Sequence, residues 1–256
     1  MKVIRVKDYQ AMSEKAKDFV LTLVKNKPDA VLGLATGSTP EGLYQLLIDD
    51  HKQNGTSYKN ITTFNLDEYI GLDGDHDQSY RYFMNEKLFN HIDIPLEQTH
   101  VPNGTAPDLA EECQRYEALL KEKGGVDLQI LGIGTNGHIG FNEPGTPFNS
   151  RTHVVELEES TRQATSRFFD SIDDVPTHAI TMGVATILES RKIILLASGK
   201  SKQEAIKKLL TEEPSEAFTA SALLNHPDVT VIVDAEALPD TNLPILKQIT
   251  LEDLAE

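Results

Sequence analysis

The residues best suited to chemistry lie in a loop at residues 132–145, which is rich in glycine and contains His138 and Glu143. The loop follows the apolar run 126–131, which predicts a buried strand. An imidazole can move a proton near neutral pH, and a neighbouring carboxylate can orient it. Glycines let the backbone bend and approach a ligand closely. We therefore predict an active-site loop in which His138 is an acid/base group oriented by Glu143.

The same loop formally matches the glycine spacing of a dinucleotide-binding turn, with Gly132, Gly134 and Gly137 at the matching positions. That turn must lead directly into a helix. Pro144 and Pro147 follow too closely for a helix to begin here. The sequence therefore argues against binding of NAD at this loop, and we expect no cofactor.

A second motif joins an apolar run at 30–35 to a predicted helix that begins near Pro40. The turn between them contains Thr36, Gly37, Ser38 and Thr39. A helix N-terminus with free N–H groups and hydroxyl donors can bind a phosphate. An ordinary capped turn would have the same composition, so both interpretations stay open on this motif alone.

A third motif places acidic residues after the strand predicted at 61–66. Asp67 and Glu68 would emerge at the carboxyl edge of the sheet, where ligands bind in α/β proteins. A partly desolvated carboxylate there could act as a general base. The alternative is a solvated acidic pair at a strand end. Further along, Arg167 and Lys202 lie where they could add positive charge for a phosphate, although each could also be an ordinary exposed residue.

These motifs need a scaffold, and the hydrophobic pattern alternates between helix and strand along the whole chain. Strands are predicted at 30–35, 61–66, 126–131, 153–157, 192–197 and 229–233, and helices at 8–26, 40–49, 78–91, 109–121, 160–170, 181–190 and 201–210. Several strands are apolar throughout, which is typical of a sheet covered on both faces. We expect one α/β domain over residues 1–256, with a mainly parallel, Rossmann-like doubly wound sheet in a three-layer arrangement.

Composition limits the choice of partners and location. The net charge of −16 disfavours nucleic acid as a partner, because phosphate backbones need clustered lysine and arginine. It leaves room for a small phosphorylated substrate, which needs only a few local cations. The sequence has no apolar stretch near the roughly 20 residues of a membrane span and no signal-peptide pattern. We expect a cytoplasmic protein that does not bind membranes and is a monomer or a homo-oligomer.

Four segments together resemble the glucosamine-6-phosphate deaminase family. They are residues 35–40 (ATGSTP), 64–69 (FNLDEY), 134–144 (GTNGHIGFNEP) and 161–169, where TR is followed by SRFF. The resemblance runs in the same order from about residue 1 to residue 235. It implies conversion of glucosamine 6-phosphate and water to fructose 6-phosphate and ammonia, in the breakdown of amino sugars such as N-acetylglucosamine. It also implies a modified Rossmann-like fold without a metal ion or an organic cofactor.

The resemblance also implies roles for individual residues. Asp67 would be the base that moves a proton between C2 and C1 of the sugar. His138 would assist ring opening, and Glu143 would hold and tune it. The phosphate would be bound by the turn and two cations, namely Thr36, Gly37, Ser38, Thr39, Arg167 and Lys202.

Two positions depart from the pattern of many relatives. Asn136 stands where many relatives have aspartate, so the pair His138–Glu143 would work without that extra negative charge. His153 and Val155 occupy positions where larger, allosteric relatives have an arginine and a lysine that bind an activator phosphate. Valine cannot contact a phosphate electrostatically, and we therefore predict no such activation.

Two other functions remain as alternatives. A 6-phosphogluconolactonase-like hydrolase would share the fold and a similar histidine loop, although the segment 141–144 and the strand end at 67–69 favour the deaminase. A non-catalytic sugar-phosphate sensor is a second alternative. It would not need an acid/base pair such as Asp67 and His138, and the sequence shows no basic helix-turn-helix segment that would favour a regulator.

Overall fold

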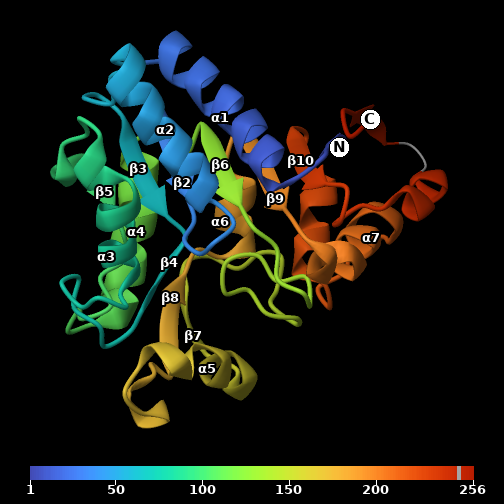
Figure 1. Cartoon of the computed structure of the whole chain (residues 1–256). Coiled ribbons are helices and arrows are strands. Elements are labelled where there is room, and N and C mark those ends of the chain that lie inside the picture. The colour runs from blue at the N-terminus through green and yellow to red at the C-terminus, as the bar shows by residue number, and fades with distance from the viewer. Residues whose placement is uncertain (247–248) are drawn as a thin grey trace.

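The computed structural model describes residues 1–246 and 249–256, and an eight-stranded sheet runs through its centre (Figure 1). The strand order is β11-β1-β10-β9-β6-β2-β3-β5, and every neighbouring pair is parallel. This arrangement confirms the predicted parallel sheet. The strands are β1 (Lys2–Val6), β2 (Val31–Leu34), β3 (Thr62–Asn65), β5 (Thr99–His100), β6 (Leu128–Leu131), β9 (Lys192–Ala197), β10 (Val229–Asp234) and β11 (Thr250–Asp253).

Helices cover both faces of this sheet, as expected for three layers. One face packs against α1 (Tyr9–Asn26), α2 (Glu41–Asn54) and α3 (Tyr80–Lys87), and the other against α4 (Leu109–Glu122), α6 (Val184–Leu188) and α7 (Gln203–Thr211). Strand β9 shows why its sequence is apolar throughout. Ile194 and Leu196 join the first layer, whereas Ile193 and Leu195 join the second. Both faces of the strand are therefore buried.

A second, antiparallel sheet of three strands lies beside the main one, in the order β4-β8-β7. Its strands are β4 (Asp67–Tyr69), β8 (His178–Thr181) and β7 (His153–Glu156). It carries a projecting lobe with α5 (Glu159–Thr165) and short 3-10 turns at 166–168 and 172–174, drawn in yellow in Figure 1.

The strand predicted at 153–157 thus belongs to this second sheet and not to the parallel one. Its alternating exposure fits a strand that buries only one face. The helix predicted at 181–190 is shorter, because residues 178–181 form β8.

The helix ends follow local capping signals. Asp8 caps α1 by accepting the N–H of Ala11, and Ser79 caps α3. Helix α2 runs beyond the predicted end at 49 to Asn54, and Gly55 caps it in a left-handed conformation with φ of 72°. Strands β1, β4, β5, β8 and β11 were not predicted. Among the helices of the described residues, none is both long enough and apolar enough to cross a membrane.

Candidate active site

A cavity of about 400 Å³ opens at the carboxyl ends of β2, β3 and β6. It is lined by residues that follow each of these strands, together with one lysine from the segment after β9. The lining residues include Thr36, Thr39, Asp67, Tyr80, His138 and Lys202. The structure thus brings the motifs of the three loops to one edge of the sheet, where ligands bind in open α/β folds.

Asp67 begins β4 directly after the end of the parallel strand β3, and only 8% of its surface is exposed. Within the described part of the chain, its carboxylate makes no hydrogen bond or ion pair, and it lines the cavity. Burial, together with the smaller effect of the neighbouring charge of Glu68, raises the pKa of Asp67 from 3.8 to about 8. Such a carboxylate is a stronger base than an exposed one.

Glu68 is buried beside Asp67 but has hydrogen-bond partners. Its carboxylate accepts the N–H groups of Tyr69 (2.9 Å), Tyr80 (2.9 Å) and Arg81 (3.0 Å). Burial raises its pKa to about 7, and these hydrogen bonds limit the rise. Glu68 therefore ties the N-terminus of α3 to β4 and places Tyr80 at the cavity. This role of Tyr80 could not be predicted from the sequence, because the hydrogen bond from its N–H to Glu68 joins segments 12 residues apart through a loop.

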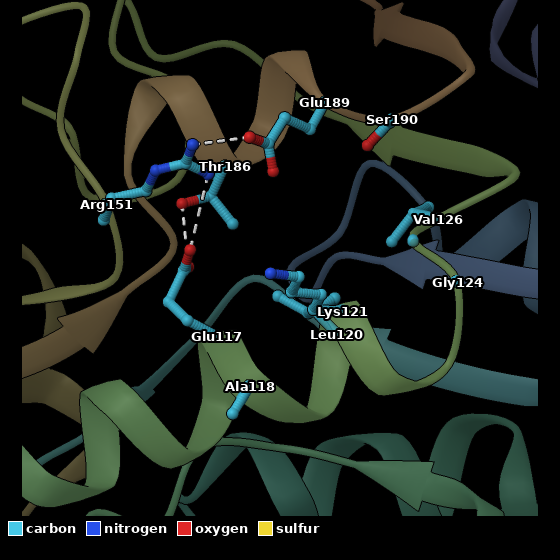
Figure 2. A pocket seen from close by; sticks show the side chains of 11 residues that line it. Glu117, Ala118, Leu120, Lys121, Gly124, Val126, Arg151, Thr186, Glu189 and Ser190 are labelled. Carbon is cyan, nitrogen blue, oxygen red and sulfur yellow. Dashed lines mark hydrogen bonds and ion pairs between the residues drawn. The ribbon is translucent and has the colours of Figure 1, made fainter.

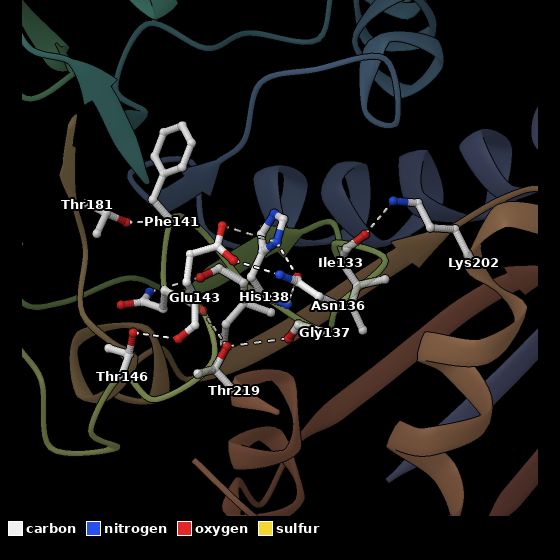
Figure 3. A network of polar contacts seen from close by, with 12 residues as sticks. Ile133, Asn136, Gly137, His138, Phe141, Glu143, Thr146, Thr181, Lys202 and Thr219 are labelled. Carbon is white, nitrogen blue, oxygen red and sulfur yellow. Dashed lines mark hydrogen bonds and ion pairs between the residues drawn. The ribbon is translucent and has the colours of Figure 1, made fainter. Parts of the chain in front are cut away.

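His138 lies in a polar network within the loop after β6 (Figure 3). Its Nδ1 is 2.7 Å from Oδ1 of Asn136, and Nδ2 of Asn136 donates to Oε2 of Glu143 at 2.7 Å. Nδ1 also lies 3.6 Å from Oε1 of Glu143. Since the amide oxygen can only accept, Nδ1 carries the hydrogen and Nε2 keeps its lone pair. Burial lowers the pKa of His138, Glu143 opposes this effect and Lys202 adds to it, which favours the neutral ring.

Two positions of this loop have no room for a side chain, and both are occupied by glycine. A Cβ at Gly134 would lie 2.1 Å from the ring of His138. Gly137 has φ of 87°, and a Cβ there would lie 2.1 Å from the ring of Phe218. Asn142 is fully buried and its side chain donates to two main-chain carbonyls, each at 2.9 Å. The loop is therefore held in one conformation that fixes the direction of the imidazole.

The turn between β2 and α2 forms another wall of the cavity; residues 35–39 are called the anion turn below. Thr36 and Thr39 line the cavity, and Gly37 adopts φ of 96°. The helix that follows has 14 residues, so its positive end faces this turn. Lys202 reaches the cavity from the other side, and its Nζ donates to the carbonyl of Ile133 at 2.6 Å. Burial lowers the pKa of Lys202.

The two predicted cations differ in position. Lys202 lies in a 3-10 turn, Lys200–Lys202, and not in the first turn of a helix as predicted; α7 begins one residue later. Arg167 belongs to the projecting lobe, where its guanidinium lies 4.6 Å from the ring centre of Phe168. Arg167 is not among the described residues that line the cavity.

A larger cavity, of about 600 Å³, lies at the opposite edge of the sheet (Figure 2). It is formed by the end of α4 and by residues that precede β6 and β9. Arg151 pairs there with Glu117 at 3.5 Å and with Glu189 at 2.5 Å. The charges in this larger cavity largely neutralise one another, and the cavity lies at the amino ends of the strands. The smaller cavity is therefore the candidate active site.

Comparison with known proteins identifies the family of the chain. The model of the family described as glucosamine-6-phosphate isomerases/6-phosphogluconolactonase matches residues 7–232. A glucosamine-6-phosphate deaminase of Geobacillus sp. (strain WCH70) is 60% identical over 238 residues, which cover 93% of this chain and 95% of that protein. A solved structure of a monomeric glucosamine-6-phosphate deaminase has a TM-score of 0.90 and 56% identity, covering 93% of this chain and 98% of the other. A 6-phosphogluconolactonase from Trypanosoma cruzi, with a TM-score of 0.76, 20% identity and coverage of 93% and 96%, shares the fold. As its motifs predicted, the chain belongs to the glucosamine-6-phosphate isomerase/6-phosphogluconolactonase family.

Proposed function

We propose that this chain converts glucosamine 6-phosphate and water to fructose 6-phosphate and ammonia. The observation that carries the proposal is the meeting of an unpaired buried carboxylate, a neutral imidazole and an anion turn in one cavity of about 400 Å³. This size suits a sugar phosphate. The high identity to deaminases over most of the chain supports the same reaction.

Ring opening is the first task, because hexosamines are mostly closed rings. Nε2 of His138 takes the proton of the C1 hydroxyl and returns a proton to the ring oxygen as the bond between C1 and that oxygen breaks. Asn136 holds the hydrogen on Nδ1, so the lone pair of Nε2 is available for this step. Glu143 stabilises the positive charge that the imidazole of His138 carries transiently.

Asp67 then removes the proton from C2 of the open chain, which gives an enolamine. The same proton, or one exchanged from water, returns to C1 and leaves an imine at C2. Water adds to this imine, and ammonia leaves as the C2 carbonyl of fructose 6-phosphate forms. The raised pKa of Asp67 suits a base that must attack a weakly acidic C–H bond.

The phosphate binds at the anion turn, which includes Ser38, together with Lys202. Backbone N–H groups, hydroxyls and one partly buried cation suit a dianion, and contacts remote from C1 and C2 orient the reacting end. Arg167 can join them only when residues 159–168 move toward the cavity, because its guanidinium lies outside it here.

An assay for ammonium and fructose 6-phosphate tests the proposal directly. We expect stoichiometric formation of both from glucosamine 6-phosphate. Hydrolysis of 6-phosphogluconolactone without any release of ammonia from the amino sugar would overturn it in favour of a lactonase. Binding of glucosamine 6-phosphate without turnover would favour a sugar-phosphate sensor.

A solved relative with 56% identity is described as monomeric, which bears on the oligomeric state of this chain. We infer that the chain acts as a monomer, like the monomeric deaminase that shares its fold. Light scattering during size-exclusion chromatography should give 28.3 kDa. A mass of twice this value or more would contradict the inference.

A further inference from the structure

We propose that the hydroxyl groups of Tyr9 and Tyr44 position the anion turn for phosphate binding. Each hydroxyl holds a carbonyl on the far side of the turn, so that the next N–H in the chain faces the cavity. The proposal rests on the proposed function, because it assigns the phosphate of the substrate to this turn. Neither tyrosine belongs to the motifs from which the sequence predicted the site.

Tyr44 holds the first peptide of the turn. Its side chain lies on α2 and is fully buried. The hydroxyl donates to the carbonyl of Ala35 at 2.5 Å and accepts the N–H of the same residue at 3.2 Å. In a trans peptide the C=O and the following N–H point in opposite directions. Fixing the carbonyl of Ala35 toward Tyr44 therefore directs the N–H of Thr36 away from it.

Tyr9 holds the other end of the turn from helix α1. Its hydroxyl lies 2.7 Å from the carbonyl oxygen of Ser38 and accepts the N–H of Gly42 at 2.8 Å. By the same geometry, the N–H of Thr39 points away from the tyrosine. Gly42 makes the approach possible, because a Cβ there would lie 2.9 Å from Cε1 of Tyr9.

The two N–H groups selected in this way are available to a ligand. Thr36 and Thr39 both line the cavity, and within the described residues neither N–H donates to another group of the chain. A carbonyl that turned toward a phosphate would repel it, whereas a fixed N–H attracts it without reorganisation. The tyrosines therefore act through preorganisation and never touch the substrate.

Conservative removal of each hydroxyl tests this role. Tyr9→Phe and Tyr44→Phe would be compared with the wild type for competitive inhibition by inorganic phosphate and for KM and kcat with glucosamine 6-phosphate. We expect the inhibition constant and KM to rise about 2- to 10-fold, the factor expected for one ordinary hydrogen bond. We expect kcat to change less than KM, because the reacting groups at C1 and C2 stay in place.

Two other tyrosines provide matched controls. Tyr82 is partly exposed and makes no side-chain hydrogen bond within the described chain, so Tyr82→Phe controls for Tyr9. Tyr58 is buried and its hydroxyl has no partner among the described residues, so Tyr58→Phe controls for Tyr44. Both controls should keep the wild-type inhibition constant. A purely structural role of Tyr9 or Tyr44 would lower the melting temperature without changing phosphate affinity.

The proposal fails if both phenylalanine variants fold and bind inorganic phosphate as tightly as the wild type. It also fails if phosphate does not compete with the substrate in the wild type. Should Tyr44→Phe not fold, Tyr9→Phe alone decides, since its side chain lies nearer the surface. Absence of ammonia release by the wild type would overturn the proposed reaction instead, and calorimetric titration with inorganic phosphate would still test the tyrosines.

Discussion

Replacing Asp67 by Asn should abolish turnover and at the same time stabilise the protein. The two effects have one origin, because the property that makes the carboxylate a strong base also makes its charge costly in the folded state. Loss of a general base lowers rates by about 10²- to 10⁴-fold. Binding of the substrate should persist, since the phosphate contacts are remote from this residue.

The size of the stabilisation follows from the pKa of Asp67. Burial raises this pKa from 3.8 to about 8, so the folded protein holds a proton that the unfolded chain releases between these pH values. The stability linked to this proton is fully present below pH 3.8. It is lost progressively as the pH rises from 3.8 through about 8. At pH 7 the loss amounts to about 4 kcal/mol at most. Asparagine avoids it, and we expect a gain of about 2–4 kcal/mol after local relaxation.

The assay is urea unfolding of both proteins at pH 4, 6 and 8. The gain should be near zero at pH 4 and should grow with pH. Asp127→Asn is a matched control, because Asp127 is also 8% exposed but pairs with Lys27 and Arg191, each at 3.0 Å. It also accepts the N–H of Val31 at 2.8 Å. This control should lose about 1–3 kcal/mol.

Equal stability of Asp67→Asn and the wild type at all three pH values would refute the reasoning about burial. Undiminished ammonia release by the variant would refute the assignment of the base. Because the two measurements are independent, either part can fail without the other.

Three further predictions concern the loop after β6 and control of the enzyme. Asn136→Asp would place a carboxylate 2.7 Å from Nδ1 of His138, which should raise the pKa of the imidazole in an NMR titration of its ring signals; an unchanged titration would contradict this role. Gly137→Ala should cost about 3 kcal/mol or more, because of its positive φ and the nearby ring of Phe218, whereas Gly145→Ala, with φ of 96° and open space around it, should cost about 1 kcal/mol. Equal losses in urea unfolding would argue against the steric contact. N-acetylglucosamine 6-phosphate should leave the substrate saturation curve unchanged, and a loss of sigmoidality on its addition would reveal the activator site that the sequence argues against.

The parallel sheet could be predicted because its central strands are apolar throughout, but the strands β1 and β11 at one side of it could not. Strand β1 contains Lys2 and Arg5, which interrupt the apolar run. Arg5 is nevertheless buried, because it pairs with Asp240 at 2.7 Å and with Asp253 at 3.0 Å. These partners lie more than 200 residues away in the sequence. No local pattern could indicate that they neutralise this arginine.

The second sheet was missed for a similar reason. Residues 67–69 are polar at two of three positions, which favours a solvated strand end. All three are buried, because β4 pairs with β8 in a register that sets Asp67 opposite Thr181. Residue types therefore identified the candidate base, whereas its burial and raised pKa depend on a strand more than 100 residues further along the chain.

The cavity has a further consequence for the pH dependence of the reaction. Burial raises the pKa of Asp67 and lowers that of His138, so both groups are driven toward their neutral forms in the free enzyme. A protonated amino group at C2 of the substrate would bring a positive charge close to Asp67. An opposite charge within about 4–6 Å favours the carboxylate. The substrate would thus help to generate its own base, and the limb assigned to Asp67 should lie at lower pH in the profile of kcat than in that of kcat/KM, since these report the complex and the free enzyme. If the two limbs coincide, the substrate does not ionise the base, and Asp67 must lose its proton before binding.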